Sequence, residues 1–440
     1  MTRPVVGFAG MTHLGIVSAT AIASAGFETV CFDSDQQLIA RLQRGALPVL
    51  EPGLDELVVR NGKRQRFTAH NDDLARCAVV YVSPDVATDD TGQSDTAVLR
   101  KLIDIVASVL DPKACMVVLS QVEPGFTRAL RAPTEERRYY QVETLVFGNA
   151  LERAMKPERY IVGCADPSRP LNSNFRAVLE AFGCPILPMR YESAELAKIS
   201  INCCLVASVS VANTLAEICE AIGADWSEIV PALKLDRRIG QFSYLAPGLG
   251  IAGGNLERDL ATVCRLADQH HTDAGVVQAW IKNSRHRRDW VVRITRSLLL
   301  DRKPDCKLAV WGLAYKENTH SVKNSPSLAA IAQMPEADLC VHDPVVSASV
   351  IKHQRLRACV DPLEALEGAE ALLILTPWPQ YRQIDPARIS AALAGRLVID
   401  PFTVLDRDKA LAAGLSHYSL GQPGSQAPRS HSQPSLSPAK

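Results

Sequence analysis

The sequence predicts an α/β protein with two Rossmann-like, doubly wound parallel-sheet domains joined by a long central helical segment. Three features lead to this prediction. Short apolar runs alternate with helical patterns near the N-terminus, and the same alternation returns after residue 307. Residues 192–223 keep helical spacing for about thirty positions, with no Pro or Gly before the final Gly223. Continuous apolar runs are typical of parallel strands that are buried on both faces, because helices cover each side of such a sheet.

The first array predicts an N-terminal domain over residues 1–190. Residues 5–9 form a short apolar strand, and residues 14–25, rich in Ala, Ile and Val, form the helix that follows it. Further buried strands are expected at residues 29–32, 78–82 and 115–119.

The middle of the chain predicts a helical segment over residues 191–300. Its first helix, residues 192–223, is apolar on most sides, so we expect it to be buried between domains or between subunits. A second Rossmann-like domain is expected at 301–420, with strands at residues 308–311, 338–341, 372–375 and 397–399. The last residues, 421–440, are rich in Ser, Pro and Gln and are expected to be disordered.

Composition describes a balanced globular chain. The 440 residues include 48 Lys plus Arg and 48 Asp plus Glu, so no net charge attracts nucleic acid or an anionic membrane, and we expect neither as a partner. The first ten residues run directly into a strand pattern without a signal sequence, and no apolar run reaches ~18 residues, which indicates the cytoplasm. The twelve cysteines form no C-x-x-C pair and are interpreted as reduced core residues, so no metal site is expected.

The turn between the first strand and the first helix predicts a dinucleotide site. Its candidate residues are Gly10, Thr12, His13, Leu14 and Gly15, and Asp33 ends the second strand. Such a turn places a pyrophosphate at a helix N-terminus, and an acid at the second strand accepts the ribose hydroxyls and favours NAD over NADP. Thr12 replaces the second glycine of the usual G-x-G-x-x-G. Taken alone, the pattern also fits an ordinary strand–turn–helix with a surface Asp.

A glycine-rich loop carries a resemblance to a known family. Residues 247–259, PGLGIAGGNLERD, resemble the active-site loop P-G-x-G-x-G-G-x-C-x-P-K-D of the UDP-glucose/GDP-mannose dehydrogenases. Other segments are similar to this family's motifs in the same order, and the resemblance covers about residues 4 to 410: 33–57 (DSD…G…EPGLDEL), 120–127 (SQVEPGFT), 143–159 (ETLVFGNAL…P.R), 198–202 (KISIN), 235–240 (LDRRIG) and 312–326 (GLAYK…T…SP).

Asn255 stands where that family has its catalytic cysteine. In the family, the thiolate captures an aldehyde as a thiohemiacetal, so that a second oxidation and hydrolysis deliver a uronic acid. A carboxamide forms no comparable covalent adduct, because its nitrogen lone pair is delocalised.

The resemblance implies that Lys198 and Asn202 are a catalytic base and an oxyanion-stabilising group. They are four residues apart and so share one face of a helix. Asp259 has the position of the family's K-D aspartate and would assist proton transfer. The alternatives are a solvated lysine and an acid that interacts with a helix dipole.

Other positions depart from the family pattern. Glu143 matches the first glutamate of the E-F-L-x-E motif, but Phe147 replaces the second, and Gln121 replaces a threonine. The resemblance links both lost residues to the water that hydrolyses the thioester. The V-P-T-P segment is also missing and is replaced around residues 84–87. The resemblance implies that the lost cysteine, second glutamate and threonine all serve acid formation, whereas the retained Lys198, Asn202 and Asp259 serve hydride transfer.

The glycine loop is predicted to bind a nucleotide sugar, and a tight structural turn is the alternative. Its four glycines would expose backbone N–H groups to a phosphate. The resemblance implies that Arg238 reaches across a dimer interface toward the sugar. It also implies that two basic residues, Lys316 and Lys323, approach the diphosphate. Lys316 is assigned, together with Gln121, to the cofactor. The candidate substrate residues are Arg238, Tyr244, Gly248, Gly250, Gly253, Gly254 and Lys323.

These residues predict a homodimeric NAD-dependent nucleotide-sugar dehydrogenase, implied by the resemblance to act in polysaccharide biosynthesis. The expected reaction is one alcohol oxidation of a UDP-hexose-like substrate, which gives an aldehyde or a ketone. Two alternatives remain: uronate formation through a hydrated aldehyde, as in a UDP-glucose 6-dehydrogenase, and a non-catalytic nucleotide-sugar-binding protein. Retention of Lys198, Asn202 and Asp259 favours an enzyme, whereas Thr12 and Gln121 favour the binding protein.

Overall fold

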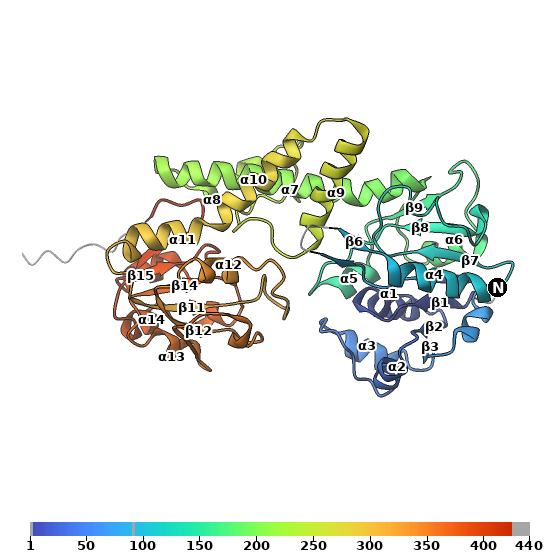
Figure 1. Ribbon diagram of the computed structural model, residues 1–440, viewed down its shortest axis with the longest axis horizontal. Helices are drawn as coiled ribbons and strands as arrows, with labels where there is room; N and C mark the ends of the chain where they lie inside the picture. The colour runs from blue at the N-terminus through green and yellow to red at the C-terminus, as the bar shows by residue number, and fades with distance from the viewer. Residues whose placement is uncertain (1–2, 90–92, 425–440) are drawn as a thin grey trace, which may run out of the picture. The chain divides into compact units, whose positions relative to one another are not determined.

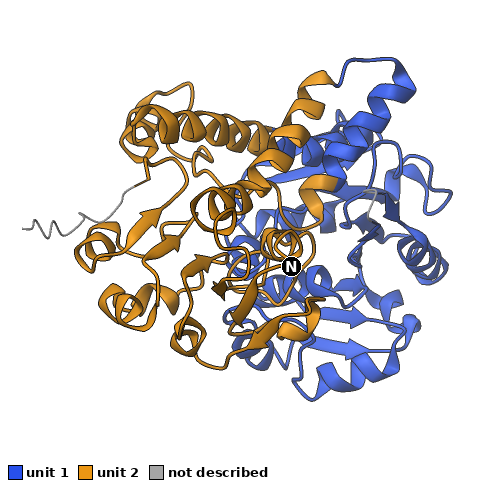
Figure 2. Ribbon diagram, turned by 60° about the vertical axis from the view of Figure 1, so that its left-hand side comes forward, with its two compact units in different colours: residues 1–203, 258–274 blue, residues 204–257, 275–440 orange. Residues whose placement is uncertain are grey.

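The structure of the protein is a computed structural model, which describes residues 3–89 and 93–424. The chain forms two compact units, coloured separately in Figure 2. Unit 1 comprises residues 1–203 and 258–274, and unit 2 comprises residues 204–257 and 275–440. The predicted central segment, residues 191–300, is thus divided between the two units, and its boundaries stay a prediction.

Each unit contains one main sheet with Rossmann strand order. The sheet of unit 1 has the order β10-β9-β8-β7-β4-β1-β2-β3, and that of unit 2 has the order β13-β12-β11-β14-β15-β16. All neighbouring strands in these sheets are parallel except β8 and β9. The strands are β1 Val6–Ala9, β2 Thr29–Phe32, β3 Gln65–Thr68, β4 Val79–Val82, β5 Ala87–Thr88, β6 Ser94–Asp95, β7 Cys115–Val118, β8 Arg138–Gln141, β9 Tyr160–Cys164, β10 Ile186–Arg190, β11 Lys307–Trp311, β12 Asp338–His342, β13 Leu356–Ala358, β14 Ala371–Ile374, β15 Leu397–Ile399 and β16 Ser416–Tyr418.

Helices cover both sheets. Helices also make up the stretch of sequence between the last strand of the first sheet and the first strand of the second. In unit 2, the strands lie between α11 and α12 on one side and α13 and α14 on the other (Figure 1). The helices are α1 His13–Ser24, α2 Gln36–Gln43, α3 Leu54–Arg60, α4 Ala97–Val109, α5 Ala150–Met155, α6 Ser173–Glu180, α7 Tyr191–Ile222, α8 Trp226–Leu235, α9 Asn255–His270, α10 Gly275–Arg288, α11 Trp290–Thr295, α12 Pro326–Ala332, α13 Pro362–Leu366, α14 Pro386–Ala392 and α15 Arg407–Ala412.

The buried strands explain the continuous apolar runs in the sequence. In β4, Val79 and Tyr81 belong to one hydrophobic cluster of unit 1, and Val80 and Val82 belong to another. Since side chains alternate along a strand, both faces of this sheet are covered. The predicted α/β class with two doubly wound parallel sheets is confirmed, and the antiparallel pairing of β8 with β9 was not anticipated.

The predicted long helix, residues 192–223, is confirmed as α7, and each of its ends differs from the prediction by one residue. Among the described residues, it is the one helix long and apolar enough to span a membrane, with a mean hydropathy of 1.6 in its most apolar window. The sequence had shown no apolar run of such length. Glu195, fully buried in this helix, accepts hydrogen bonds from the N–H groups of Gly125 at 2.6 Å and Thr127 at 2.8 Å. This paired carboxylate is typical of a helix that packs within protein.

Two further expectations concern the cysteines and the C-terminal tail. The twelve cysteines all lie in the described part of the chain and none is in a disulfide; eight are buried, whereas Cys204 is exposed. The tail was predicted to begin at residue 421, but the Gly421 N–H donates to Glu220 at 2.8 Å and the Gly421 carbonyl accepts from Trp226 at 2.8 Å. The start of the tail is therefore corrected, because these backbone bonds attach it to unit 2. Residues 425–440 lie outside the described residues.

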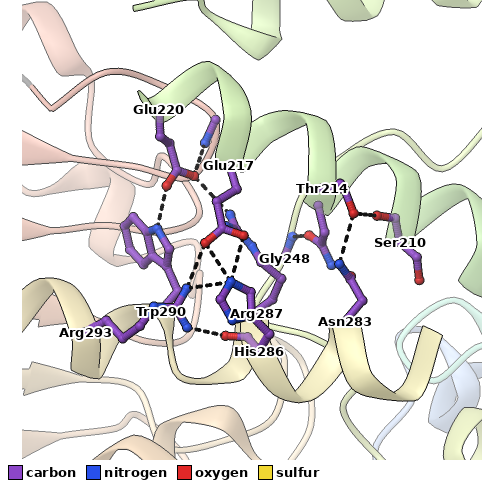
Figure 3. A network of polar contacts seen from close by, with 12 residues as sticks. Ser210, Thr214, Glu217, Glu220, Gly248, Asn283, His286, Arg287, Trp290 and Arg293 are labelled. Carbon is purple, nitrogen blue, oxygen red and sulfur yellow. Dashed lines mark hydrogen bonds and ion pairs between the residues drawn. The ribbon is translucent and has the colours of Figure 1, made fainter. Parts of the chain in front are cut away.

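A buried arginine joins α7 to α10 within unit 2 (Figure 3). The Arg287 side chain is fully buried; its Nη2 lies 3.0 Å from Glu220 Oε1, and its Nη1 lies 3.3 Å from Glu217 Oε2. His286 also pairs with Glu217 at 2.8 Å, and Trp290 Nε1 donates to Glu220 at 2.7 Å. A buried cation with several partners holds the two helices at one register, because sliding would leave charges unpaired.

Replacing Arg287 with alanine is expected to lower the free energy of unfolding of unit 2 by about 3 kcal/mol, since the loss of one member of a buried ion pair leaves its partners uncompensated. Arg285→Ala, an exposed position of the same helix, is the matched control. All five tryptophans lie in unit 2, so denaturant unfolding followed by tryptophan fluorescence monitors this unit. Equal, small effects of the two substitutions would contradict a structural role for Arg287.

Candidate functional site

The predicted dinucleotide turn lies at the carboxyl end of β1 in unit 1. The Gly10 N–H donates to the Phe32 carbonyl at 2.9 Å, and the Met11 N–H donates to Asp33 Oδ2 at 2.8 Å, so the turn is held against the end of β2. A Cβ on Gly15 would lie 2.0 Å from the Gly10 carbonyl oxygen, so a side chain there would prevent the close approach of α1. Gly10, Gly15 and Asp33 therefore fit a dinucleotide at this turn.

His13, in the first turn of α1, connects this turn to the chain after β8. Its Nε2 lies 3.1 Å from Glu51 Oε2, and both side chains are buried. Glu51 also accepts hydrogen bonds from the N–H groups of Gly148 at 3.1 Å and Ala150 at 2.6 Å. The ring of Phe147 stacks on His13 with 4.2 Å between centroids. Phe147 thus supplies an apolar wall where the family pattern has a second glutamate.

Lys198 and Glu143 form one pair of candidate catalytic groups. Lys198, on α7, places its Nζ 3.9 Å from Glu143 Oε2, and neither side chain is more than one-fifth exposed. Burial raises the pKa of Glu143 to about 7, although Lys198 opposes the shift. A carboxyl group with this pKa exchanges a proton with a neighbour near neutral pH. The sequence had placed Lys198 with Asp259 rather than with Glu143.

Asp259 forms a second group with Asn202, and both side chains are buried. Asn202 Nδ2 donates to Asp259 Oδ2 at 2.5 Å, and Gln121 Nε2 donates to Asp259 Oδ1 at 2.5 Å. Arg258 Nε lies 3.3 Å from the same Oδ1, and its Nη2 donates to Gln121. Asp259 therefore fixes the orientation of the Asn202 amide, whose second N–H stays available as a donor.

Sequence reasoning missed two residues of this region. Arg258 was treated only as a variant of the family's lysine, yet it is buried and bridges Gln121 to Asp259. Tyr140, on β8, is fully buried, and its hydroxyl has no hydrogen-bond partner among the described residues. Burial raises the pKa of Tyr140 well above its usual value, and the nearby Glu195, Glu143 and Asp259 add to this effect. A tyrosine in an apolar strand gives no signal of this kind in the sequence.

The glycine-rich loop belongs to unit 2 and is held by side chains from other elements. Asn213 accepts a hydrogen bond from the Gly248 N–H at 2.8 Å, and the Ile251 N–H donates to Ser284 Oγ at 2.7 Å. Gly250 has a φ of 76°, and a Cβ there would lie 2.3 Å from the Ser284 carbonyl oxygen. The loop therefore requires glycine at position 250 for structural reasons as well.

The rest of the loop lies beside the segment that carries Lys323. The Gly253 N–H donates to the Lys323 carbonyl at 3.1 Å, and Asn324 Nδ2 donates to the Gly253 carbonyl at 2.8 Å. A Cβ on Gly254 would lie 3.8 Å from the Lys323 side chain. Asn255 follows as the exposed first residue of α9. Asn324 was missed in the sequence, although it orients this loop.

The remaining candidates lie elsewhere in the chain. The Arg238 side chain is 90% exposed and pairs with Asp236 at 2.6 Å, and Tyr244 is also exposed. Lys316 Nζ lies 5.7 Å from the ring centre of Tyr315 in unit 2, whereas the other candidate cofactor residues lie in unit 1. Leu14 is a buried residue of α1. Within residues 3–89 and 93–424, no three or more His, Cys, Asp or Glu side chains are grouped to hold a metal ion.

Comparison with protein families assigns most of the chain. Three models of the UDP-glucose/GDP-mannose dehydrogenase family match in order: the NAD binding domain at residues 5–182, the central domain at 192–285 and the UDP binding domain at 309–407. The first match covers the turn and the Lys198 partner Glu143 described above. The prediction of NAD as the cofactor is thereby confirmed.

Known proteins resemble the chain along most of its length. UDP-glucose 6-dehydrogenase TuaD of Bacillus subtilis (strain 168) is 28% identical over 429 residues, which span 94% of this chain and 92% of that protein. A UDP-glucose dehydrogenase structure from Pyrobaculum islandicum has a TM-score of 0.80 at 26% identity, with 92% of this chain and 95% of that chain covered. A UDP-D-ManNAc dehydrogenase structure from Pyrococcus horikoshii shares the fold, with a TM-score of 0.80 at 20% identity over 95% of this chain and 99% of that chain.

Proposed function

Because the chain belongs to the UDP-glucose/GDP-mannose dehydrogenase family, as an NAD-dependent oxidoreductase of CH–OH groups, we propose that it performs a single alcohol oxidation of a UDP-hexose-like substrate. The observation that supports this proposal is a group of buried and partly buried polar residues in unit 1. Lys198, Glu143, Asn202 and Asp259 are paired there in a way that suits proton removal and oxyanion stabilisation.

In this proposal, Lys198 removes the proton of the substrate hydroxyl. Glu143 lies beside Lys198 with a pKa of about 7, so it takes the proton onward or holds the amine in place. Asn202, oriented by Asp259, donates its second amide N–H to the developing alkoxide. Bound at the α1 turn, NAD supplies the hydride acceptor.

We propose no second oxidation, because the chain lacks the nucleophile and the water-activating residues that this step requires. Asn255 stands at the place of the nucleophile and forms no thioester. Phe147 is stacked on His13, and Gln121 is engaged by Asp259 and Arg258, so neither activates a hydrolytic water. The product is then an aldehyde, or a ketone if a ring carbon is oxidised.

Purified protein incubated with NAD and a panel of nucleotide sugars tests this function. We expect NADH formation with at least one UDP-hexose and a product two mass units lighter than the substrate, because one oxidation removes two hydrogens. An absence of turnover across a broad panel would favour a nucleotide-sugar-binding protein instead.

The proposed assembly is a cytoplasmic homodimer. Four apolar residues of α7 in unit 2 are exposed at helical spacing: Val211, Leu215, Ile218 and Ile222. They lie on one helix face, and such a stripe is typical of a surface covered by another subunit. Arg238, also exposed, would then reach the partner's substrate. Twelve cysteines outside disulfides favour a reducing compartment.

Asp33 is proposed to determine the choice of NAD over NADP. Asp33→Ala is expected to weaken NAD binding about ten- to hundredfold, since hydrogen bonds to a charged acceptor are lost, and to narrow the preference over NADP, whose 2′-phosphate the carboxylate repels. Calorimetric titration with both cofactors measures the change, and Asp55→Ala, an exposed acid of α3, is the control. NADP binding as tight as that of NAD in the unmutated protein would refute this role.

A further inference from the structure

A carboxylate in the first turn of α9 links three segments of unit 2. Glu257 Oε1 accepts a hydrogen bond from Arg288 Nη2 at 2.9 Å, and Glu257 Oε2 accepts one from Asn324 Nδ2. Arg288 is the last residue of α10, and Asn324 lies in the segment before α12. Glu257 stands where the family's loop motif has a proline, whose side chain accepts no hydrogen bond. The link is therefore a feature of this chain's own sequence.

The two partners of Glu257 also hold the glycine-rich loop. Arg288 Nη2 donates to the Ile251 carbonyl at 3.2 Å, and Asn324 Nδ2 donates to the Gly253 carbonyl at 2.8 Å. Each donor thus binds the carboxylate and one carbonyl of the loop. Because Glu257 accepts from both donors, it orients them toward these two carbonyls.

Holding a carbonyl also sets the direction of the N–H group that follows it. A peptide group is planar and trans, so its N–H points opposite to its C=O. The bond to the Ile251 carbonyl therefore orients the Ala252 N–H, and the bond to the Gly253 carbonyl orients the Gly254 N–H. Backbone N–H groups of this loop are the donors that we expect to meet a phosphate. A loop whose peptide groups are oriented in advance loses less entropy when a ligand binds.

The exposure of the ion pair favours a role in positioning over a role in stability. The Glu257 and Arg288 side chains are 35% and 24% exposed, and pairs of such exposure add little to the free energy of unfolding. Asn324 has a φ of 50°, in the left-handed region that non-glycine residues seldom adopt. This backbone conformation accompanies the placement of its amide against both Glu257 and the loop.

We propose that Glu257 is a positioning residue for the diphosphate of the nucleotide sugar. Through Arg288 and Asn324, it sets the peptide groups of the glycine-rich loop before the ligand binds. This inference rests on the proposed function, because a nucleotide sugar is the ligand that it presupposes. Loss of Glu257 then weakens the binding of a ligand that carries the diphosphate and spares a ligand that lacks it.

Binding of UDP tests the inference, since the chain matches the family's UDP binding domain. Glu257→Ala removes both hydrogen bonds, whereas Glu257→Gln retains one acceptor oxygen and removes the charge. In calorimetric titrations we expect Glu257→Ala to bind UDP roughly five- to thirtyfold more weakly than the unmutated protein, and Glu257→Gln to lie between the two. The affinities for uridine, which lacks the diphosphate, and for NAD should stay unchanged.

A second variant breaks the same link from its other side. Asn324→Gly retains a residue that tolerates the left-handed backbone and removes the amide, so it should also weaken UDP binding. Combined with Glu257→Ala, it should cost less than the product of the two separate losses, because both substitutions break one link. Glu228→Ala, an exposed glutamate of α8 in the same unit, is the matched control.

The possible outcomes separate this inference from the proposed function. Equal UDP affinity in Glu257→Ala and the unmutated protein would overturn the inference alone. Equal losses for UDP and uridine, together with a lower denaturant midpoint in tryptophan fluorescence, would also overturn it, because Glu257 would then have a structural role. A complete lack of UDP binding by the unmutated protein would refute the proposed substrate class, and this inference with it.

Discussion

Replacing Lys198 with alanine is expected to lower kcat by about two to four powers of ten, the usual scale of general acid–base catalysis. Lys198 lies beside the raised-pKa carboxyl of Glu143, and its side chain is only 12% exposed. In the proposed mechanism, the removal of Lys198 leaves the substrate hydroxyl without a base, and Glu143 loses the cation beside it. NAD affinity should change little, because the predicted NAD contacts lie at the α1 turn.

Steady-state kinetics on the nucleotide sugar identified in the panel, with calorimetric titration of NAD, measures both quantities. Lys101→Ala, an exposed lysine of α4, is the control for loss of one positive charge in the same unit. Unchanged turnover in Lys198→Ala would remove Lys198 from the mechanism. A parallel loss of NAD affinity would indicate instead that the substitution disturbs the fold of unit 1.

Periodicity predicted the fold well because both sheets are buried on both faces. The strands at residues 29–32 and 397–399 were located to the residue, because each is a short apolar run. The helix α7 was located to within one residue, because its apolar residues keep helical spacing. Short strands with mixed polarity gave no such signal: β10, ILPMR, is half exposed and was not predicted. The antiparallel β9 was likewise invisible, since direction depends on the path of the chain between strands.

The candidate site was predictable as a set of residues but not as a set of pairs. Motif positions named Lys198, Glu143, Asn202 and Asp259 as candidate catalytic residues, which stays a prediction. The sequence could not show that Lys198 pairs with Glu143 while Asp259 binds Asn202. Such pairing depends on side-chain directions across three segments distant in sequence.

A single NADH per sugar is expected under single-turnover conditions, together with a carbonyl product that a hydrazide reagent traps. The physical reason is the carboxamide at position 255, which cannot hold the aldehyde covalently for a second oxidation. Rapid mixing of excess enzyme with NAD and one equivalent of sugar, followed by NADH absorbance and product mass, gives the stoichiometry. Two NADH with a uronate product would exclude the single-oxidation proposal.

Asn255→Cys tests which part of the second half-reaction is missing. A thiol at the start of α9 restores the nucleophile, so a second NADH should appear in part, but hydrolysis of the resulting thioester should stay slow. Phe147, stacked on His13, provides no carboxylate for the water, and Gln121 is held by Asp259 and Arg258 rather than free to bind it. We therefore expect a covalent adduct of the variant, detectable as a mass increase of the intact protein, and Asn255→Ser as the control should form none. Rapid, complete uronate formation by Asn255→Cys alone would show that Phe147 and Gln121 do not matter for hydrolysis, and that position 255 by itself separates one oxidation from two.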